Sequence, residues 1–210
     1  MPLTVVRTVE PVIESIALDD VKAFLQVTTN VDDTLLSDII FHTTDYLESV
    51  IHRQFLTATY RFSLDAFPWD PSWSTQQGLM QWTRFPRTLI EIPRPPLQSI
   101  TSIKYQNINN VETTFATTEY GVDADSEPGR VYLLPGHSWP STYAIPNAVK
   151  IIYLAGWTSV DAMPARLRSL LLFVIGDLYH YRRGTSVEDF IQEVPYVKRL
   201  IRSLNFGDVF

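Results

Sequence analysis

The stretch EIPRPPLQSITSIKYQN (residues 91–107) sets the geometry of the middle of this chain. Pro93, Pro95 and Pro96 fall within four residues, and none of them can donate a hydrogen bond to a neighbouring strand. Because proline also forces the residue before it into extended geometry, this proline corner ends one strand and directs the next at a fixed angle. The alternation in SITSIKY, directly after the corner, predicts that next strand.

The sequence on both sides of the proline corner also alternates with a period of two, as half-buried strands do. TATYRFSLDAF begins this pattern at Thr57, and AVKIIYLAG ends it at Gly156. Between them, VETTFAT and EYGVDADSEPGRVYLL predict short strands joined by tight turns. The spacing indicates about six or seven antiparallel strands, arranged as a sandwich or a barrel.

Helical periodicity frames this β-rich middle. LDDVKAFLQV (18–27) predicts a short helix, and a longer one is expected to about His52, capped by Asp32 or Asp33. A further helix is predicted over 163–183, with apolar residues around more than half its circumference, as in a helix at the centre of a helical layer. A last amphipathic helix begins at Pro195.

The layout predicts an α+β fold, a helical bundle built from the two chain ends with an inserted antiparallel β-sandwich or barrel. We expect residues 1–56 and 157–210 to form the helical domain and residues 57–156 the β domain.

Composition excludes several classes of protein. The absence of cysteine excludes disulfides and thiol nucleophiles, and the net charge of −6 is unlike that of a protein that grips phosphates. The N-terminal sequence lacks the pattern of a signal peptide, and the most apolar segment, Leu167–Ile175, is too short to span a membrane. We therefore expect a soluble protein.

Residue types able to carry catalysis or bind a metal are scattered along the sequence. The four histidines have no metal-ligand spacing, and neither a phosphate-binding loop nor a nucleophile elbow is present. Asp123, Asp125 and Glu127 alternate as in a calcium loop, but Pro128 replaces the required glycine, which favours a hairpin turn. Asp177 either pairs with Arg182, Arg183 or a partner chain, or lies on a solvated helix face. No catalytic, metal or cofactor site is predicted.

Aromatic and basic residues are better candidates for binding. Trp69, Trp73 and Trp82 fall in or beside a proline-rich loop and could stack on sugars or bases, or pack against a neighbouring subunit, which we favour. The basic stripe on the last helix either faces solvent or contacts an acidic partner. Its members are Lys198, Arg199 and Arg202.

The order of these features resembles that of phage head–tail connector (adaptor) proteins. The resemblance rests on IALDDVKAFLQV with DDTLLSDIIFHTTDYLESVIHRQF, on IEIPRPPLQSITSIKYQN, on YGVDADSEPGRVYLLPGHSWP, and on AVKIIYLAGW followed by MPARLRSLLLFVIGDLYHYR. It covers roughly residues 15–185. Ala17, where a Ser or Thr cap is usual, and the Trp-rich loop 68–84 depart from the pattern.

The resemblance implies a structural virion protein of the neck, made in the host cytoplasm, with no enzymatic activity and no cofactor. Such connectors form rings, usually dodecameric, below the portal protein, where they extend the channel for double-stranded DNA and dock a stopper or tail terminator. DNA would pass without sequence-specific binding, and no membrane is involved.

The resemblance also suggests where contacts lie. We expect the long helices to form the ring, with Arg166, Arg168 and Asp177 in inter-subunit pairs. The tail 187–210, which includes Phe206 and Phe210, is expected to reach the portal. The alternatives are a carbohydrate-binding β-sandwich module, a hydrolase with dispersed carboxylates, or another neck protein such as a stopper or tail terminator.

Overall fold

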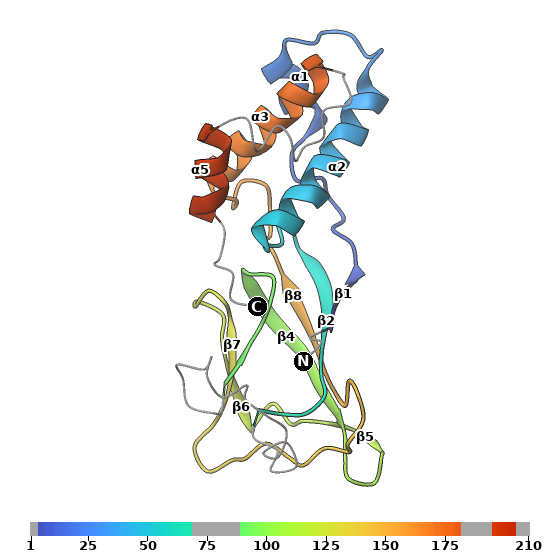
Figure 1. The fold of residues 1–210 in the computed structure, drawn as a ribbon, viewed down its shortest axis with the longest axis vertical. Coiled ribbons are helices and arrows are strands. Elements are labelled where there is room, and N and C mark those ends of the chain that lie inside the picture. The colour runs from blue at the N-terminus through green and yellow to red at the C-terminus, as the bar shows by residue number, and fades with distance from the viewer. Residues whose placement is uncertain (1–3, 69–88, 182–194, 205–210) are drawn as a thin grey trace. The chain divides into compact units, whose positions relative to one another are not determined.

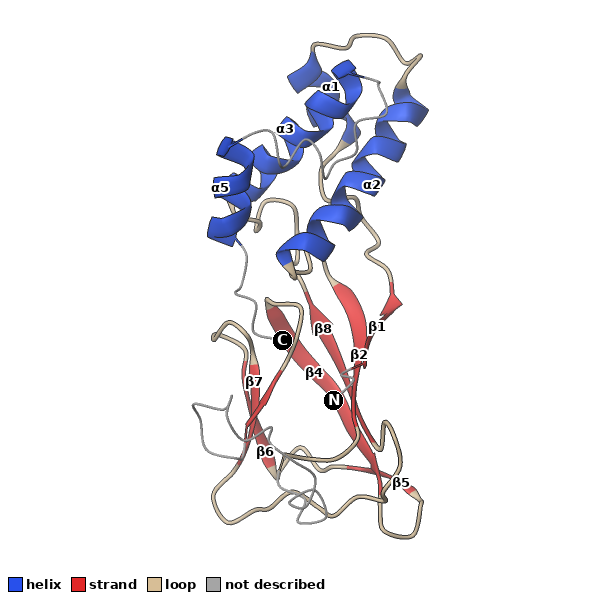
Figure 2. Ribbon diagram, in the orientation of Figure 1, coloured by secondary structure: helices blue, strands red, loops and turns tan. Residues whose placement is uncertain are grey.

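The computed structural model describes residues 4–68, 89–181 and 195–204, which form helices and antiparallel sheets (Figures 1 and 2). The chain divides into two compact units. The β unit comprises residues 1–10 and 58–156, and the helical unit comprises residues 11–57 and 157–210. The mixed α and β character predicted from the sequence is confirmed.

In the helical unit, one described helix packs against each of the other described helices. Its described helices are α1 (Leu18–Leu25), α2 (Asp33–Ile51), α3 (Ala165–Tyr181) and α5 (Pro195–Leu204). Helix α3 contacts α1, α2 and α5, as expected for a helix with a wide apolar surface. The shared core draws side chains from both ends of the chain, for example Leu36 and Leu47 of α2, Leu171 of α3 and Val197 of α5.

The cap position of α2 is as predicted, but the side chains of the two aspartates at this start bind other groups. Asp32 occupies the N-cap position without a side-chain capping hydrogen bond. The Tyr179 hydroxyl donates to Asp32 Oδ2 at 2.7 Å, and the Lys22 ammonium binds Asp33 Oδ1 at 2.7 Å. Both carboxylates therefore tie α2 to neighbouring elements of the helical unit.

The β unit contains two open antiparallel sheets. The larger has the order β1 (Thr4–Val9), β2 (Ala58–Leu64), β8 (Val149–Ala155), β4 (Leu97–Gln106) and β5 (Glu112–Thr114). The smaller has the order β3 (Leu89–Glu91), β7 (Arg130–Leu133) and β6 (Tyr120–Asp123). Within the described part of the chain neither sheet closes into a barrel, so that alternative is wrong. Residues of both sheets share one apolar core, as Phe62 and Ile103 of the larger and Ile90 and Val131 of the smaller do.

The proline corner joins the two sheets. It leaves β3 in the smaller sheet and enters β4 in the larger one, so it ends one strand and redirects the chain, as predicted. The Pro93 carbonyl accepts a hydrogen bond from the buried Tyr153 hydroxyl at 2.9 Å, and Ile92 N–H donates to the Gly129 carbonyl at 2.8 Å. The corner is thereby fixed to both β8 and the turn before β7.

Strand β1 was not predicted. Among the described strands it lies at the edge of the larger sheet, where it pairs with β2, and the register shifts between Arg7 and Val9. Its residues are exposed or half-buried, so no apolar alternation distinguishes it from a loop. Residues 4–9 thus pair with the β unit, although the sequence placed them with the helices.

Candidate assembly surfaces

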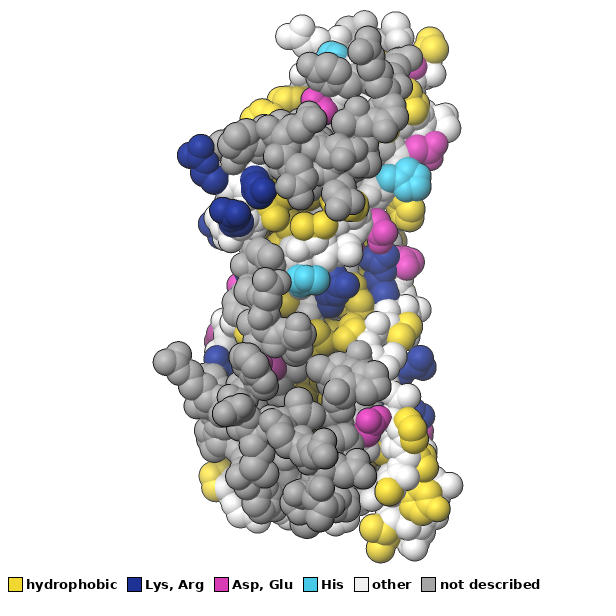
Figure 3. All heavy atoms as spheres, in the orientation of Figure 1, with side chains coloured by type: hydrophobic (Ala, Val, Ile, Leu, Met, Phe, Trp, Pro, Cys, Tyr) yellow, Lys and Arg dark blue, Asp and Glu magenta, His cyan; other side chains and the backbone are white. Residues whose placement is uncertain are grey.

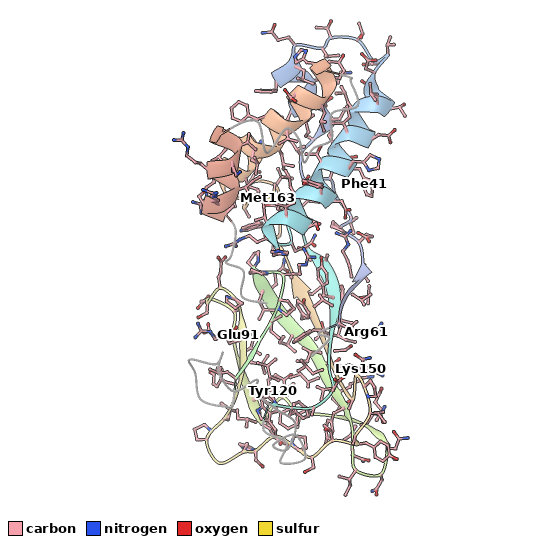
Figure 4. All side chains as sticks on the ribbon, in the orientation of Figure 1. Phe41, Arg61, Glu91, Tyr120, Lys150 and Met163 are labelled. Carbon is pink, nitrogen blue, oxygen red and sulfur yellow. The ribbon has the colours of Figure 1, made fainter. Side chains whose placement is uncertain are left out.

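Helix α2 carries one outer face that does not contribute to the core. Leu36, Ile40 and Leu47 are buried on its inner side. Phe41 projects from the outer side and is 65% exposed (Figure 4). Asp38 and Asp45 are exposed three residues before and four residues after Phe41, spacings that place all three on one side of the helix. The result is an acidic face with an aromatic side chain between two carboxylates, which we call the α2 face.

Helix α5 carries the predicted basic stripe. Its inner side buries Val197, Ile201 and Leu204. Arg199 and Arg202 are exposed, whereas Lys198 is half-buried. We call this stripe the α5 face. Figure 3 shows Lys and Arg side chains gathered over this helix.

The C-terminal end of α5 is fixed by a cation. Arg53, just after α2, donates from Nε to the Leu204 carbonyl at 2.8 Å. A guanidinium in this position satisfies a helix-terminal carbonyl and interacts favourably with the negative end of the helix dipole. The contact orients α5, and with it the α5 face, on the helical unit.

A second aromatic surface joins α1 and α3. Phe24 and Phe173 meet edge to face with ring centroids 6.2 Å apart, although they are 46% and 42% exposed. Gly176 allows this contact, since an added Cβ would lie 3.3 Å from the Phe24 ring. Nothing in the sequence indicated the pair, because its members belong to different helices from opposite ends of the chain.

The structure separates the three α3 residues predicted to pair between subunits. Arg166 and Asp177 share the face of α3 that presents Phe173, and they are exposed and half-buried, respectively. Arg168 lies two positions from Arg166 and points elsewhere. It contacts Asp20 at 3.4 Å and Asp161 at 3.7 Å, both within its own chain.

Five predicted contact residues lie outside the described residues. They are Trp69, Trp73, Trp82, Phe206 and Phe210. The loop at 66–85 and the tail at 187–210 are described only over residues 66–68 and 195–204.

The β unit exposes an apolar tip beyond the end of β4. Ile108 and Val111 are 67% and 56% exposed in the turn between β4 and β5. Tyr143, 41% exposed, joins them because its backbone N–H donates to the Gln106 carbonyl at 2.9 Å. This surface was not predicted, although the apolar residues within the turn sequence NINNV are a usable indication of it.

A charged cluster lies beside this tip. The Glu112 carboxylate is 3.2 Å from the Lys150 ammonium and 3.5 Å from that of Lys104. The hydrogen bond from Lys150 is the main cause that lowers the pKa of Glu112. Glu112 therefore stays ionised at neutral pH, and the cluster forms a polar border to the apolar tip.

The acidic turn at Asp123 is explained by local hydrogen bonds. Ser126 donates to the Asp123 carboxylate from its hydroxyl at 2.6 Å and from its backbone at 3.1 Å, and these bonds lower the pKa of Asp123. The turn joins β6 to β7, which are paired as a hairpin. The hairpin interpretation of the sequence is confirmed.

The described residues contain no group of three or more His, Asp or Glu side chains able to hold a metal ion. No helix within the described ranges is long and apolar enough to cross a membrane.

Solved structures share this fold over almost its whole length. A chain of the native gene transfer agent (GTA) virion aligns with a TM-score of 0.71 and 16% identity, covering 99% of this chain and 97% of that one. A chain from the neck of the empty GTA particle, computed with C6 symmetry, gives 0.70 and 18% over 100% and 98%. A chain from the neck of the native particle, computed with C12 symmetry, gives 0.65 and 20% over 100% and 98%.

Sequence comparison identifies the family. No curated protein matches the chain significantly. The family model of the phage gp6-like head-tail connector proteins matches residues 15–127, which is more than half of the chain. The resemblance found in the sequence is thereby confirmed, and the chain belongs to the phage gp6-like head-tail connector proteins, structural proteins of the virion neck.

Proposed function

We propose that copies of this chain form a ring in the neck of a tailed particle, next to the portal protein. Two observations together support this proposal. The chain matches the connector family, and its whole fold is shared with chains from particle necks computed with C6 and C12 symmetry. The ring extends the DNA channel and offers a docking surface for the next neck or tail protein, a stopper or a tail terminator. Its role is structural, and it catalyses no reaction.

The two units have different tasks in this proposal. The helical unit, built from residues 11–57 and 157–210, is the connector domain that forms the ring, because its outer surface carries the α2 face, the α5 face and the Phe24–Phe173 pair. The inserted β unit presents the apolar tip at Ile108 and Val111 to the adjoining neck component. Exposed apolar patches of this kind mark protein contacts.

DNA is not gripped in this ring. The chain carries a net charge of −6, and a protein that binds duplex DNA tightly would neutralise phosphates with Lys and Arg. A channel wall with the same sign of charge as the phosphates favours sliding over retention.

The ring is tested by mixing the purified chain with portal protein and measuring the mass of the product by native mass spectrometry. We expect a cyclic oligomer bound to the portal, formed either beforehand or upon binding. A chain that stays monomeric alone and with the portal at micromolar concentration would overturn the proposal.

Two variants locate the neighbours. The tail 187–210 is expected to reach the portal. Removing only residues 205–210 keeps α5, whose inner side belongs to the helical core, and should weaken portal binding, whereas unchanged binding would exclude that role for the end of the tail. Replacing Trp69 and Trp73 with Ala should weaken ring assembly if the Trp-rich loop packs on a neighbour, and binding of the intact chain to a glycan array would instead favour a sugar-binding loop.

A further inference from the structure

The helical unit presents opposite charges on two different sides. Exposed Arg199 and Arg202 mark the α5 face, and exposed Asp38 and Asp45 mark the α2 face. In Figure 3 the Lys and Arg side chains gather over α5 on the left of this unit, while acidic and histidine side chains follow its right side, where Figure 1 places α2. The two faces therefore point away from one another within a single chain.

We propose that the α5 face of one copy docks on the α2 face of the next copy, and that this contact builds the ring. The inference rests on the proposed function, since it assigns the contact within the ring proposed above. The dimensions are compatible, because Asp38 and Asp45 lie about 10 Å apart along α2 and the 10 residues of α5 extend over about 15 Å. Arg and Asp in this arrangement give charge-assisted hydrogen bonds.

Phe41 supplies the apolar part of this contact. It is 65% exposed, whereas Tyr46 on the same helix is half-buried, and it lies between the two carboxylates. Large aromatic residues surrounded by charged groups are typical of the centre of an interface, where they contribute most of the affinity.

The geometry also selects a ring over a symmetric dimer. In a twofold dimer the α5 face of each copy would have to meet the α2 face of the other at the same time, which two faces on opposite sides of one unit cannot do, and a face placed on itself would bring like charges together. A contact between two different faces of the same chain is heterologous and generates a ring when its rotation closes.

Charge reversal with rescue tests this contact. One variant carries Arg199→Glu and Arg202→Glu, so both of its faces are acidic, and the other carries Asp38→Lys and Asp45→Lys, so both are basic. For each variant alone, we expect the fraction of chain found in rings to be at least roughly tenfold lower than for the natural chain, because like charges then face each other. An equimolar mixture should restore rings in which the variants alternate. The measurement is native mass spectrometry, alone and with the portal.

Control variants distinguish this contact from a general effect of charge. Arg61→Glu and Asp125→Lys reverse exposed charges in the β unit and should leave ring formation unchanged. Phe41→Ala should weaken assembly without altering the far-ultraviolet circular dichroism of the chain. Since the chain has no cysteine, a D38C/R202C variant should also give covalent rings with a short bismaleimide, whereas D38C alone should not.

The outcomes separate the two proposals. Normal rings from both reversed variants, or a mixture that fails to assemble although the natural chain does, would overturn the contact and leave the proposed function intact. If the α5 face instead binds the portal, the Arg199 and Arg202 variant would keep its rings and lose only portal binding. That result would also overturn the proposed contact between the α5 face and the α2 face. If the natural chain forms no ring under any of these conditions, the proposed function itself fails.

Discussion

At the scale of single residues, buried polar contacts hold connecting segments against the two cores. Tyr153 on β8 is fully buried, stacks on Tyr60 with ring centroids 5.6 Å apart, and donates its hydroxyl proton to the Pro93 carbonyl. Glu48 on α2 is 4% exposed and accepts hydrogen bonds from Gln54 and from the backbone of Phe55. Each of these side chains joins a regular element to a connecting segment.

Tyr153 should make the β unit sensitive to alkali. Burial raises the pKa of Tyr153, so the native state requires the neutral phenol, whereas in the unfolded chain tyrosine ionises near pH 10. The stability that the neutral phenol provides is complete below about pH 10 and is lost as the pH rises further. Urea unfolding at pH 8 and pH 11 should therefore show a smaller alkaline loss in Tyr153→Phe than in the natural chain. An equal loss in both would contradict this assignment.

Glu48 should stabilise the segment where the chain leaves α2. Its Oε1 accepts from Gln54 Nε2 at 2.7 Å and from Phe55 N at 2.9 Å, and Gln54 also donates to the Leu56 carbonyl. Glu48→Ala leaves buried donors unpaired and should lower the free energy of unfolding by about 2 kcal/mol or more. Glu48→Gln keeps an acceptor oxygen and should lower it less. Chemical denaturation measures both, and equal effects of the two substitutions would count against a hydrogen-bonding role.

At the scale of elements, the position of α1 depends on one glycine of α3. Gly176 is buried beneath Phe24 and Leu25. Helix α1 has only eight residues and no side-chain cap, so its own hydrogen bonds hold it weakly. Its contacts with α3, and the bridge from Lys22 to Asp33, keep it in place.

A larger side chain at Gly176 should displace α1. An added Cβ would lie 3.3 Å from the Phe24 ring and 3.5 Å from Leu25, so Gly176→Ala requires only a small shift and gains helix propensity. Gly176→Leu would overpack the contact and should lower the free energy of unfolding by about 1–3 kcal/mol. Thermal unfolding of both variants gives the comparison, and the idea fails if Leu is tolerated as well as Ala.

At the scale of the whole molecule, the described residues form two apolar cores that share no member. The helical core contains Leu47 and Leu171, and the β core contains Ile103 and Ile151. The chain passes between the units after residues 10, 57 and 156. Each unit therefore has its own apolar burial to drive its folding.

Core substitutions should act on one unit at a time. Ile103→Ala should lower the stability of the β unit by about 2–5 kcal/mol, and Leu47→Ala should do the same for the helical unit. The helix signal in far-ultraviolet circular dichroism should be lost at lower temperature or denaturant concentration in Leu47→Ala, and should change much less in Ile103→Ala. Calorimetry that finds a single transition shifted equally by both would show that the units unfold together.

The sequence alone determined the elements and their order. Periods of two and of three to four residues are local properties, so they located α2, α3, α5 and β8, and the proline corner marked the change of sheet. The ordered landmarks also sufficed to identify the family. The basic stripe of α5 was recognisable because Arg199 and Arg202 lie one helical turn apart.

Only the tertiary structure decided which side chains met. The edge strand β1 is half-exposed and has no apolar pattern, so its pairing with β2 depends on residues fifty or more positions away. Asp32 was expected to cap α2 and instead binds Tyr179, while Glu48 is buried although glutamate usually lies at the surface. The Phe24–Phe173 pair and the opposition of the α2 and α5 faces arise from helix packing. Contacts between distant segments depend on the position of every element, so local periodicity does not predict them.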